Sequence, residues 1–172
     1  GTIEYPADLP WKGIIPLADI FKKHTSLPVI VTNDANAAAV GEMIYGGARG
    51  MKNFVVITLG NGLGSGFVVD GKLVYGHDGF AGEIGHTSIR PGMSNRDCGC
   101  GRKGCLETYV SATGLKRTVL KIMADRLDDS ELRRFSFEEL DSKKFYEAAR
   151  RGDPIALEAF EHTGAMLGFK LA

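Results

Sequence analysis

The sequence predicts an α/β fold, and three observations support this prediction. Short runs of β-branched and apolar residues alternate with longer amphipathic or Ala-rich stretches, which are patterns typical of strands and helices. A strong hairpin signal, Asp70-Gly71, joins two of the strand patterns. The chain has 172 residues, of which 44% are hydrophobic and 24% charged, as expected for a globular domain with a sizeable core.

The N-terminal part predicts a short helix, a buried strand and an Ala-rich helix. Residues 1–28 form a Pro-containing opening segment with a short helical pattern from Leu17 to Phe21. The run Val-Ile-Val-Thr at 29–32 is typical of a buried strand. The helix that follows covers about 35–45 and closes at Gly46-Gly47, because glycine commonly ends a helix.

The rest of the chain predicts strands first and helices afterwards. Strand patterns lie at 54–59, 66–69 and 72–75. The segment 76–104 is rich in turn residues and predicts a loop. Beyond Glu107 the helical patterns lie at 112–126, 136–150 and 154–172. Asp153-Pro154 favours a helix start, because Asp caps a helix well and Pro fits its first turn.

The charge balance gives no sign of a polyanionic partner. The chain has 21 basic and 21 acidic residues, so we expect no general attraction to nucleic acid or to an anionic membrane. No apolar run approaches the roughly 20 residues needed to span a bilayer. The opening stretch Gly1–Pro6 lacks the basic start and apolar region of a signal peptide.

All cysteines of the chain lie between Asp97 and Glu107, in the sequence D-C-G-C-G-R-K-G-C-L-E. They are Cys98, Cys100 and Cys105. Any disulfide framework would leave one of them over, whereas thiolates in glycine-rich turns suit a tetrahedral zinc site that lacks one ligand. His86 is the candidate fourth ligand and His77 is its rival. The alternative is a surface turn with three reduced thiols.

A second glycine-rich stretch, Leu59–Gly66, lies between two strand patterns. It is neither a Walker A loop nor a dinucleotide fingerprint, because no Lys-Ser/Thr follows it and it opens no helix. A glycine turn exposes several backbone N–H groups at one place, which suits phosphate oxygens. The stretch alone fits a phosphate-binding turn and a flexible hairpin equally well.

Asn33 and Asp34 stand where a predicted strand ends and a helix begins. This is the usual position of ligand-binding groups in α/β folds. Either residue would also make a good N-cap for the Ala-rich helix. Their position alone favours the cap.

Four motifs taken together resemble one family. In chain order they are Asn33-Asp34-Ala35-Asn36-Ala37-Ala38-Ala39 with Gly41-Glu42, the turn Gly60–Gly66, Gly79-Phe80-Ala81-Gly82-Glu83-Ile84-Gly85-His86, and Cys98-Gly99-Cys100-Gly101 with Gly104-Cys105-Leu106-Glu107. They closely resemble the ROK family, named for repressors, open reading frames and kinases, which contains bacterial glucokinases and N-acetylhexosamine kinases. The resemblance covers about residues 5–115.

The resemblance implies an actin-like or hexokinase-like ATPase fold with two lobes, each built on a ribonuclease H-like sheet. It implies that residues 1–34 end the first lobe with a strand at the sugar cleft. Residues 35–172 would form most of the second lobe, with a zinc-binding loop at 86–107. The family's N-terminal phosphate motif and C-terminal adenosine motif have no counterpart here, so we expect the central section of a longer protein and little activity from this chain alone.

The resemblance also implies roles for individual residues. Asp34 matches the catalytic base. The residues that match sugar-binding positions are Asn33, Asp34, Glu83, His86 and Glu107. The residues that match the phosphate turn are Gly60, Asn61, Gly62 and Gly64. The ligands of a structural zinc ion would be His86, Cys98, Cys100 and Cys105. Zinc would then fix the position and tautomer of His86 and anchor the loop that carries Glu107.

Two positions depart from the family pattern. Asn61 stands where the phosphate turn usually has Thr or Ser. Near the start of the chain, Ala7 stands at a position that is often a sugar-binding Asn, and Asp8 follows it, so Asp8 is not counted among the site residues.

We therefore expect an ATP-dependent kinase of a hexose or N-acetylhexosamine, using Mg²⁺ in the full-length protein. The resemblance further implies a cytoplasmic homo-oligomer, either a dimer or a tetramer. The first alternative is a sugar-responsive transcriptional repressor of the same family, which would bind nucleic acid only if a helix-turn-helix domain precedes this section. The second is a zinc-stabilised scaffold without catalysis.

Overall fold

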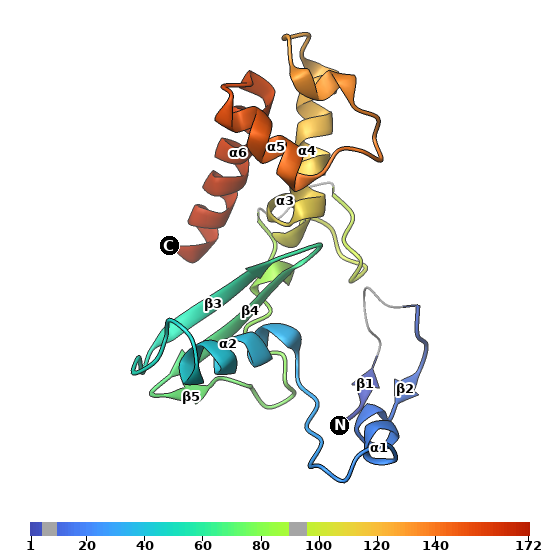
Figure 1. Ribbon diagram of the computed structural model, residues 1–172, viewed down its shortest axis with the longest axis vertical. Helices are drawn as coiled ribbons and strands as arrows, with labels where there is room; N and C mark the ends of the chain where they lie inside the picture. The colour runs from blue at the N-terminus through green and yellow to red at the C-terminus, as the bar shows by residue number, and fades with distance from the viewer. Residues whose placement is uncertain (5–9, 90–95) are drawn as a thin grey trace. The chain divides into compact units, whose positions relative to one another are not determined.

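The computed structural model describes residues 1–4, 10–89 and 96–172 (Figure 1). Ala7 and Asp8 therefore lie outside the described residues. The chain divides into two compact units. The first comprises residues 1–57 and 65–82, and the second comprises residues 58–64 and 83–172. The expected division into lobes at residue 34 stays a prediction.

The N-terminal part of the first unit is a small hairpin and a helix. Strands β1 (Ile3–Glu4) and β2 (Ile14–Ile15) pair antiparallel, and α1 (Leu17–Lys22) follows. The predicted short helix is thus confirmed. The predicted buried strand at 29–32 is wrong, because this segment has no regular secondary structure and Ile30 is 89% exposed. A strand needs a neighbouring strand to pair with, and the described residues offer none to this segment.

Helix α2 (Asp34–Ile44) and a three-stranded sheet complete the first unit and lead into the second. The sheet order is β3 (Phe54–Leu59), β4 (Leu63–Val69), β5 (Lys72–Leu73). Asp70 and Gly71 form the predicted hairpin turn, and both have positive φ, as a type I′ turn requires. Strand β4 begins earlier than predicted, so the second half of the glycine stretch is strand rather than turn.

Glycine in β4 lets helix α2 approach the sheet closely. A Cβ at Gly66 would lie 2.6 Å from the Cβ of Ala39 and 2.7 Å from the carbonyl oxygen of Ala35. Ala35 and Ala39 are themselves fully buried. The small residues on both surfaces therefore set the distance between helix and strand.

The second unit is mainly helical. Its α-helices are α3 (Glu107–Val110), α4 (Ala112–Asp125), α5 (Ser142–Arg150) and α6 (Pro154–Leu171). Two 3₁₀ turns, η1 (Ile84–His86) and η2 (Glu131–Arg134), lie between them or before them. Side chains of Ser111, Asp141 and Asp153 cap α4, α5 and α6.

The predicted helix at 136–150 is shorter in the structure, because α5 begins only at Ser142. Asp141 accepts a hydrogen bond from the N–H of Lys144 and so fixes the helix start. Before it, the Glu139 side chain accepts from the N–H of Ser136 and closes a separate turn. These local side-chain bonds compete with helix formation at 136–141.

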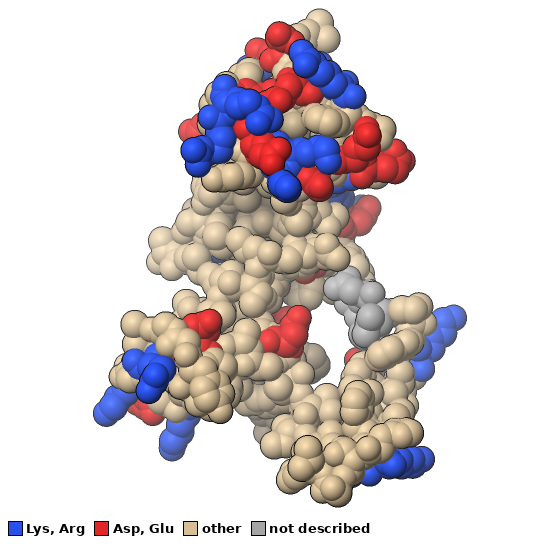
Figure 2. Space-filling view, in the orientation of Figure 1, with Lys and Arg blue, Asp and Glu red and all other residues tan. Residues whose placement is uncertain are grey.

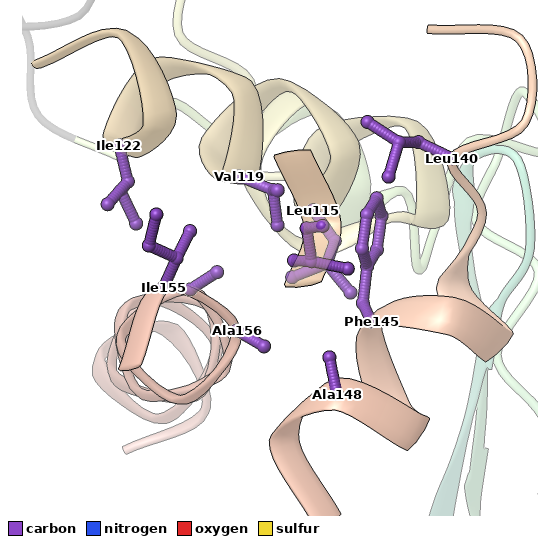
Figure 3. Packing of buried hydrophobic residues seen from close by; sticks show 10 residues of the cluster. Leu115, Val119, Ile122, Leu140, Phe145, Ala148, Ile155 and Ala156 are labelled. Carbon is purple, nitrogen blue, oxygen red and sulfur yellow. The ribbon is translucent and has the colours of Figure 1, made fainter. Parts of the chain in front are cut away.

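The core of the second unit lies between α4, α5 and α6 (Figure 3). Leu115, Val119 and Ile122 of α4 face the buried residues of the two later helices. The other members of this cluster are Leu132, Leu140, Phe145, Ala148, Ile155, Ala156 and Ala159. Leu115, Val119 and Ile122 are spaced as residues on one face of a helix are, which explains why the later helices pack on this side of α4.

Charged side chains of both signs gather over the helices of the second unit (Figure 2). Several form exposed ion pairs: Lys121–Asp125, Arg151–Glu131, Arg126–Asp128 and Arg126–Glu158. Exposed pairs of this kind each contribute at most about 1 kcal/mol, so the apolar core dominates stability. Within the described part of the chain, no helix has both the length and the apolar character needed to cross a bilayer.

We expect Phe145→Ala to destabilise the protein strongly, because the ring is fully buried in this core. Emptying such a site costs about 3–5 kcal/mol of unfolding free energy, measured by urea denaturation. Tyr146→Ala is the matched control, since its side chain is 53% exposed and should cost far less. Equal losses in the two variants would contradict this description of the core.

Candidate functional site

Four side chains of the second unit converge to form a group that could hold a metal ion. They are His86, Cys98, Cys100 and Cys105, and their ligand atoms all lie within 4.8 Å of one another. The Sγ atom of Cys98 is 3.6 Å from Nδ1 of His86, and the Sγ atoms of Cys100 and Cys105 are 3.7 Å apart. All three cysteines are free of disulfides.

These spacings fit tetrahedral coordination. Thiolates bound to zinc at about 2.3 Å stand about 3.8 Å from each other and about 3.6 Å from a bound imidazole nitrogen. Cys98 and Cys105 are buried, so the group is shielded from solvent on their side. His77, the rival ligand, has a side chain that is 99% exposed and lies beside Asp78 instead.

The loop holding the cysteines is shaped by short backbone hydrogen bonds. The N–H of Gly101 donates to the carbonyl of Cys98, and the N–H of Cys98 donates to the carbonyl of Arg102. Gly101 has φ +82°, which favours glycine there. Ser88 pairs antiparallel with Cys105, which brings the strand-like segment after His86 beside the last cysteine.

The three thiols differ in their readiness to ionise. Burial raises the pKa of the Cys98 thiol to about 12, and burial also raises the pKa of Cys105. Burial opposes ionisation of Cys100 too, but the backbone N–H and guanidinium of Arg102 stabilise its thiolate and lower its pKa to about 6. Metal binding requires thiolates, so a cation here would have to displace protons from the buried thiols.

Arg96 holds this loop to the helices of the second unit. Its guanidinium donates to the carbonyls of Thr108 (2.7 Å) and Gly114 (3.1 Å) and to Oγ1 of Thr118 (3.0 Å). The same group lies 4.1 Å from the ring centroid of Tyr109, and burial lowers its pKa. No sequence pattern predicts this role, because the acceptors are mainly backbone carbonyls that no motif specifies.

Glu107 connects the cysteine cluster with the glycine turn. Its Oε2 accepts a hydrogen bond from the N–H of Leu63 at 3.0 Å, and its Oε1 lies 3.5 Å from Sγ of Cys98. The N–H of Ala112 donates to the carbonyl of Gly60, which fixes the turn at a second point. A Cβ at Gly62 would come too close to Oε2 of Glu107, so a side chain there would displace the carboxylate.

The glycine turn has fewer residues than the sequence predicted, because β4 already begins at Leu63. The N–H of Gly60 donates to the carbonyl of Gly62, and the N–H of Leu63 is occupied by Glu107. Among the residues predicted to bind phosphate, Gly60 therefore has an N–H group that is already bonded. Asn61, at the tip of the turn, lines a hollow in the surface of the second unit.

His86 is positioned by the short turn that precedes it. Its N–H donates to the carbonyl of Glu83, and the next N–H, that of Thr87, donates to the carbonyl of Ile84. Gly85 packs on the carbonyl of Leu63 with no room for a Cβ. The start of β4 thus supports both Glu107 and the turn carrying His86.

Asn33 and Asp34 lie in the first unit at the start of α2. The N-cap is Asn33, whose Oδ1 accepts from the N–H groups of Ala35 (2.8 Å) and Asn36 (3.3 Å). Asp34 is the first helical residue, with Oδ1 also 2.8 Å from the N–H of Ala35, and it is exposed. The capping function expected at this position is therefore provided mainly by Asn33.

Asn36 was not singled out from the sequence. It is 2% exposed, and its Oδ1 has no hydrogen-bond partner among the described residues. It follows two residues after Asp34 on the first turn of α2, where the sequence offers no pattern that separates a buried Asn from a capping one.

Comparisons with known proteins find one family over the whole chain. The family model described as the ROK family matches residues 1–172. A glucokinase of Halalkalibacterium halodurans is 40% identical over 175 residues, which cover 100% of this chain and 52% of that protein. A xylose repressor of Caldicellulosiruptor bescii is 31% identical over 172 residues, which cover 100% of this chain and 42% of the repressor.

Among solved structures, a ROK family glucokinase from Streptomyces griseus in complex with glucose and AMPPNP superposes with a TM-score of 0.87. The two are 35% identical, and the match covers 99% of this chain and 55% of the other. This likeness confirms the predicted actin-like and hexokinase-like α/β fold. The chain spans about half the length of the curated relatives it matches.

We expect Gly62→Ala to displace Glu107 from the turn. The methyl group would overlap Oε2, and the Leu63 N–H would lose its acceptor, at a cost of about 1–3 kcal/mol of unfolding free energy. Urea denaturation measures this cost, and hydrogen exchange of the Leu63 amide should become faster.

Gly60→Ala is the control for this experiment, since a Cβ at Gly60 would meet nothing within 4 Å. If Gly60→Ala destabilised the protein as much as Gly62→Ala, contact with Glu107 would not be the reason for glycine at position 62.

Proposed function

The chain belongs to the ROK family, and we propose that the full-length protein is an ATP-dependent sugar kinase acting on a hexose or N-acetylhexosamine. The proposal is supported by glucokinases at 35–40% identity over essentially the whole chain. Because the chain spans about half of those relatives, the activity is assigned to the full-length protein.

The observation that favours a kinase most is the state of Asp34. A sugar hydroxyl is a poor nucleophile, so a kinase needs a carboxylate within reach to accept its proton. Asn33 serves as the N-cap of α2, and Asp34 presents an exposed carboxylate beside it. A carboxylate that served only as a cap would be expected at the N-cap position itself, which Asn33 occupies.

The residues that we propose bind the sugar ring are Asn33, Asp34, Glu83, His86 and Glu107. Their side chains offer the carboxylates, amide and imidazole that sugar hydroxyls need as donors and acceptors. The γ-phosphate of the donor would approach the turn formed by Gly60, Asn61, Gly62 and Gly64, with the Asn61 amide donating where relatives have a hydroxyl.

The cluster of Cys98, Cys100, Cys105 and His86 would hold a structural zinc ion. The donor set and the spacings suit four-coordinate zinc with no position left open for substrate. With one ring nitrogen on the metal, His86 would keep its other nitrogen protonated and able to donate to a sugar hydroxyl. Thiolate ligands of this kind persist in a reducing compartment, which supports a cytoplasmic protein.

The full-length protein would bind ATP together with Mg²⁺, which supplies positive charge to the phosphate oxygens during transfer. This chain's own part is to hold the sugar, accept its proton at the Asp34 carboxylate and present backbone N–H groups to phosphate. We further propose a cytoplasmic homo-oligomer, in keeping with the family.

A second candidate is a sugar-responsive repressor, which the similarity to a xylose repressor supports. The two candidates separate in a coupled phosphorylation assay of the full-length protein with glucose, mannose, N-acetylglucosamine and N-acetylmannosamine. A kinase should turn over at least one of them. Sugar binding without turnover, together with a helix-turn-helix domain ahead of this chain, would decide for the repressor.

We expect one tightly bound zinc ion per chain, held through His86 and not through His77. His86→Ala should lose both the metal and sugar affinity, because the fourth ligand is gone and the loop carrying Glu107 loosens. His77→Ala should keep both, since its side chain is exposed. Elemental analysis and sugar titration measure the two quantities, and the opposite pattern would overturn the ligand assignment.

We expect Asp34→Asn to lower kcat of the full-length enzyme by about 10²–10⁴-fold, the usual contribution of a positioned proton acceptor. Sugar affinity should survive, because the amide keeps the shape and still bonds a hydroxyl. Folding should survive as well, since Asn33 provides the cap.

Steady-state kinetics and sugar titration measure both effects. A variant with near-normal kcat would end the assignment of Asp34 as the base.

A further inference from the structure

A hollow between α4 and α6 of the second unit is lined by residues to which the proposed function gives no role. It has a volume of about 730 Å³, within the range of small-molecule sites. Arg96 and Tyr109 line one part of it, and side chains of the two helices supply the rest of the wall. The residues proposed to bind sugar, phosphate or zinc do not line it.

Two half-buried guanidinium groups lie at this hollow without an anionic partner. Arg96 donates to two backbone carbonyls and to Oγ1 of Thr118, and Nη1 of Arg117 donates to the carbonyl of Asp97 at 3.1 Å. Each of these acceptors is neutral, and no carboxylate of the described residues forms an ion pair with Arg96 or Arg117. Removing a charge from water without a counter-charge is costly, so an anion bound here would relieve that cost.

The same two segments bring both guanidinium groups together. Arg96 reaches Thr118 on α4, while Arg117, the residue before Thr118, reaches back to the backbone of Asp97, the residue after Arg96. Two like charges that lie close together repel each other, and an anion between them is attracted by both. Guanidinium groups suit this purpose, because their fork of N–H groups matches the oxygens of a carboxylate or a phosphate.

The carboxylates in the wall do not supply the missing charge. Asp125 pairs with Lys121 at 2.8 Å, and Glu158 pairs with Arg126. Glu161 is exposed to solvent, where the effect of its charge on other groups is small. The two guanidinium groups therefore keep their charge uncompensated at the hollow.

The rest of the wall suits a carbon skeleton. Tyr109, Ile122 and Ala165 contribute apolar atoms to it. The ring of His162 lies 6.2 Å from that of Tyr109, measured between centroids, and is tilted against it by 36°. Nδ1 of His162 is buried and has no hydrogen-bond partner among the described residues. An unsatisfied polar atom in the wall of a hollow is a place where a bound molecule or an ordered water is expected.

We propose that this hollow binds a small organic anion, with its carboxylate or phosphate group against Arg96 and Arg117 and its carbon skeleton against Tyr109 and His162. The two guanidinium groups select an anion, and the apolar part of the wall selects an organic molecule over an inorganic ion. The inference goes beyond the proposed kinase function, because it concerns residues outside the proposed sugar, phosphate and zinc sites.

Carboxylates and phosphate esters share this chemistry, so the test uses two organic anions, citrate and glucose 6-phosphate, with inorganic phosphate for comparison. Isothermal titration of each into the full-length protein measures the affinity. Saturating glucose and a non-hydrolysable ATP analogue are present throughout, so that the sites proposed for the sugar and the phosphoryl donor are filled. Binding of citrate alone would assign the hollow to carboxylates, and binding of glucose 6-phosphate alone would assign it to phosphate esters. Binding of neither would overturn the proposal.

Arg117→Gln removes one of the two charges. Arg96 is left unaltered because it also holds the cysteine loop, whereas the hydrogen bond of Arg117 to the carbonyl of Asp97 is exposed, so folding should survive its loss. The affinity for the organic anion that binds should fall about tenfold, as expected when a charge-assisted hydrogen bond is lost. Unchanged affinity in this variant would overturn the proposal.

Inorganic phosphate tests the contact with the carbon skeleton. It should bind about tenfold more weakly than the organic anion, because it buries no apolar surface against Tyr109 and His162. Equal affinities would overturn the assignment of an organic ligand.

Arg134→Gln is the matched control, because Arg134 is an exposed arginine of the same unit that does not line this hollow. This variant should bind each anion as the unaltered protein does. Thermal unfolding of every variant reports whether the fold is intact. If Arg134→Gln weakened binding as much as Arg117→Gln, the effect would come from net charge alone, and the proposal would be overturned.

The outcome is separable from that of the kinase assignment, because the titrations require no turnover. A protein that phosphorylates no sugar, but whose affinity for the organic anion falls with Arg117→Gln, would support the role of the hollow and contradict the kinase. An active kinase that binds neither citrate nor glucose 6-phosphate under these conditions would do the reverse.

Discussion

The carboxylate of Glu107 is the interaction on which the second unit's site depends. One oxygen accepts the Leu63 N–H at the start of β4, and the other lies beside the Cys98 sulfur. A single side chain thereby ties the glycine turn to the cysteine loop. A displacement of the loop that carries Glu107 would affect the turn, because the Leu63 N–H would lose its acceptor. The absence of a side chain at Gly62 is the condition for this contact.

A metal ion in the cysteine cluster would then also hold in place residues that are not its ligands. The three cysteines and His86 close a loop whose other end is clamped by Arg96 onto the helical core. The hydrogen bond from the Ala112 N–H to the Gly60 carbonyl makes a second connection. The cysteine loop, the glycine turn and helix α4 are thus linked to one another. A metal ion bound in the cluster would therefore help to fix the glycine turn as well as its own ligands.

The sequence predicts a feature of the structure correctly where that feature depends on residues close together in the chain. The turn Asp70-Gly71, the helix start at Asp153 and the spacing of the cysteines each follow from short-range rules, and the structure agrees with them. The sequence does not predict a residue's role where that role depends on partners far away in the chain. The apolar run containing Ile30 has the composition of a strand, but the described residues offer it no strand to pair with. The buried contacts of Arg96 are mainly to backbone carbonyls, which any sequence provides.

The roles proposed for the site residues differ in the chemistry that they need. Under the proposal, Asp34 accepts a proton, whereas Asn33, Glu83, His86 and Glu107 make hydrogen bonds that require no proton transfer. A change at the Asp34 carboxylate alone would therefore remove transfer and leave sugar recognition in place. This would account for a chain that is similar both to glucokinases and to a xylose repressor.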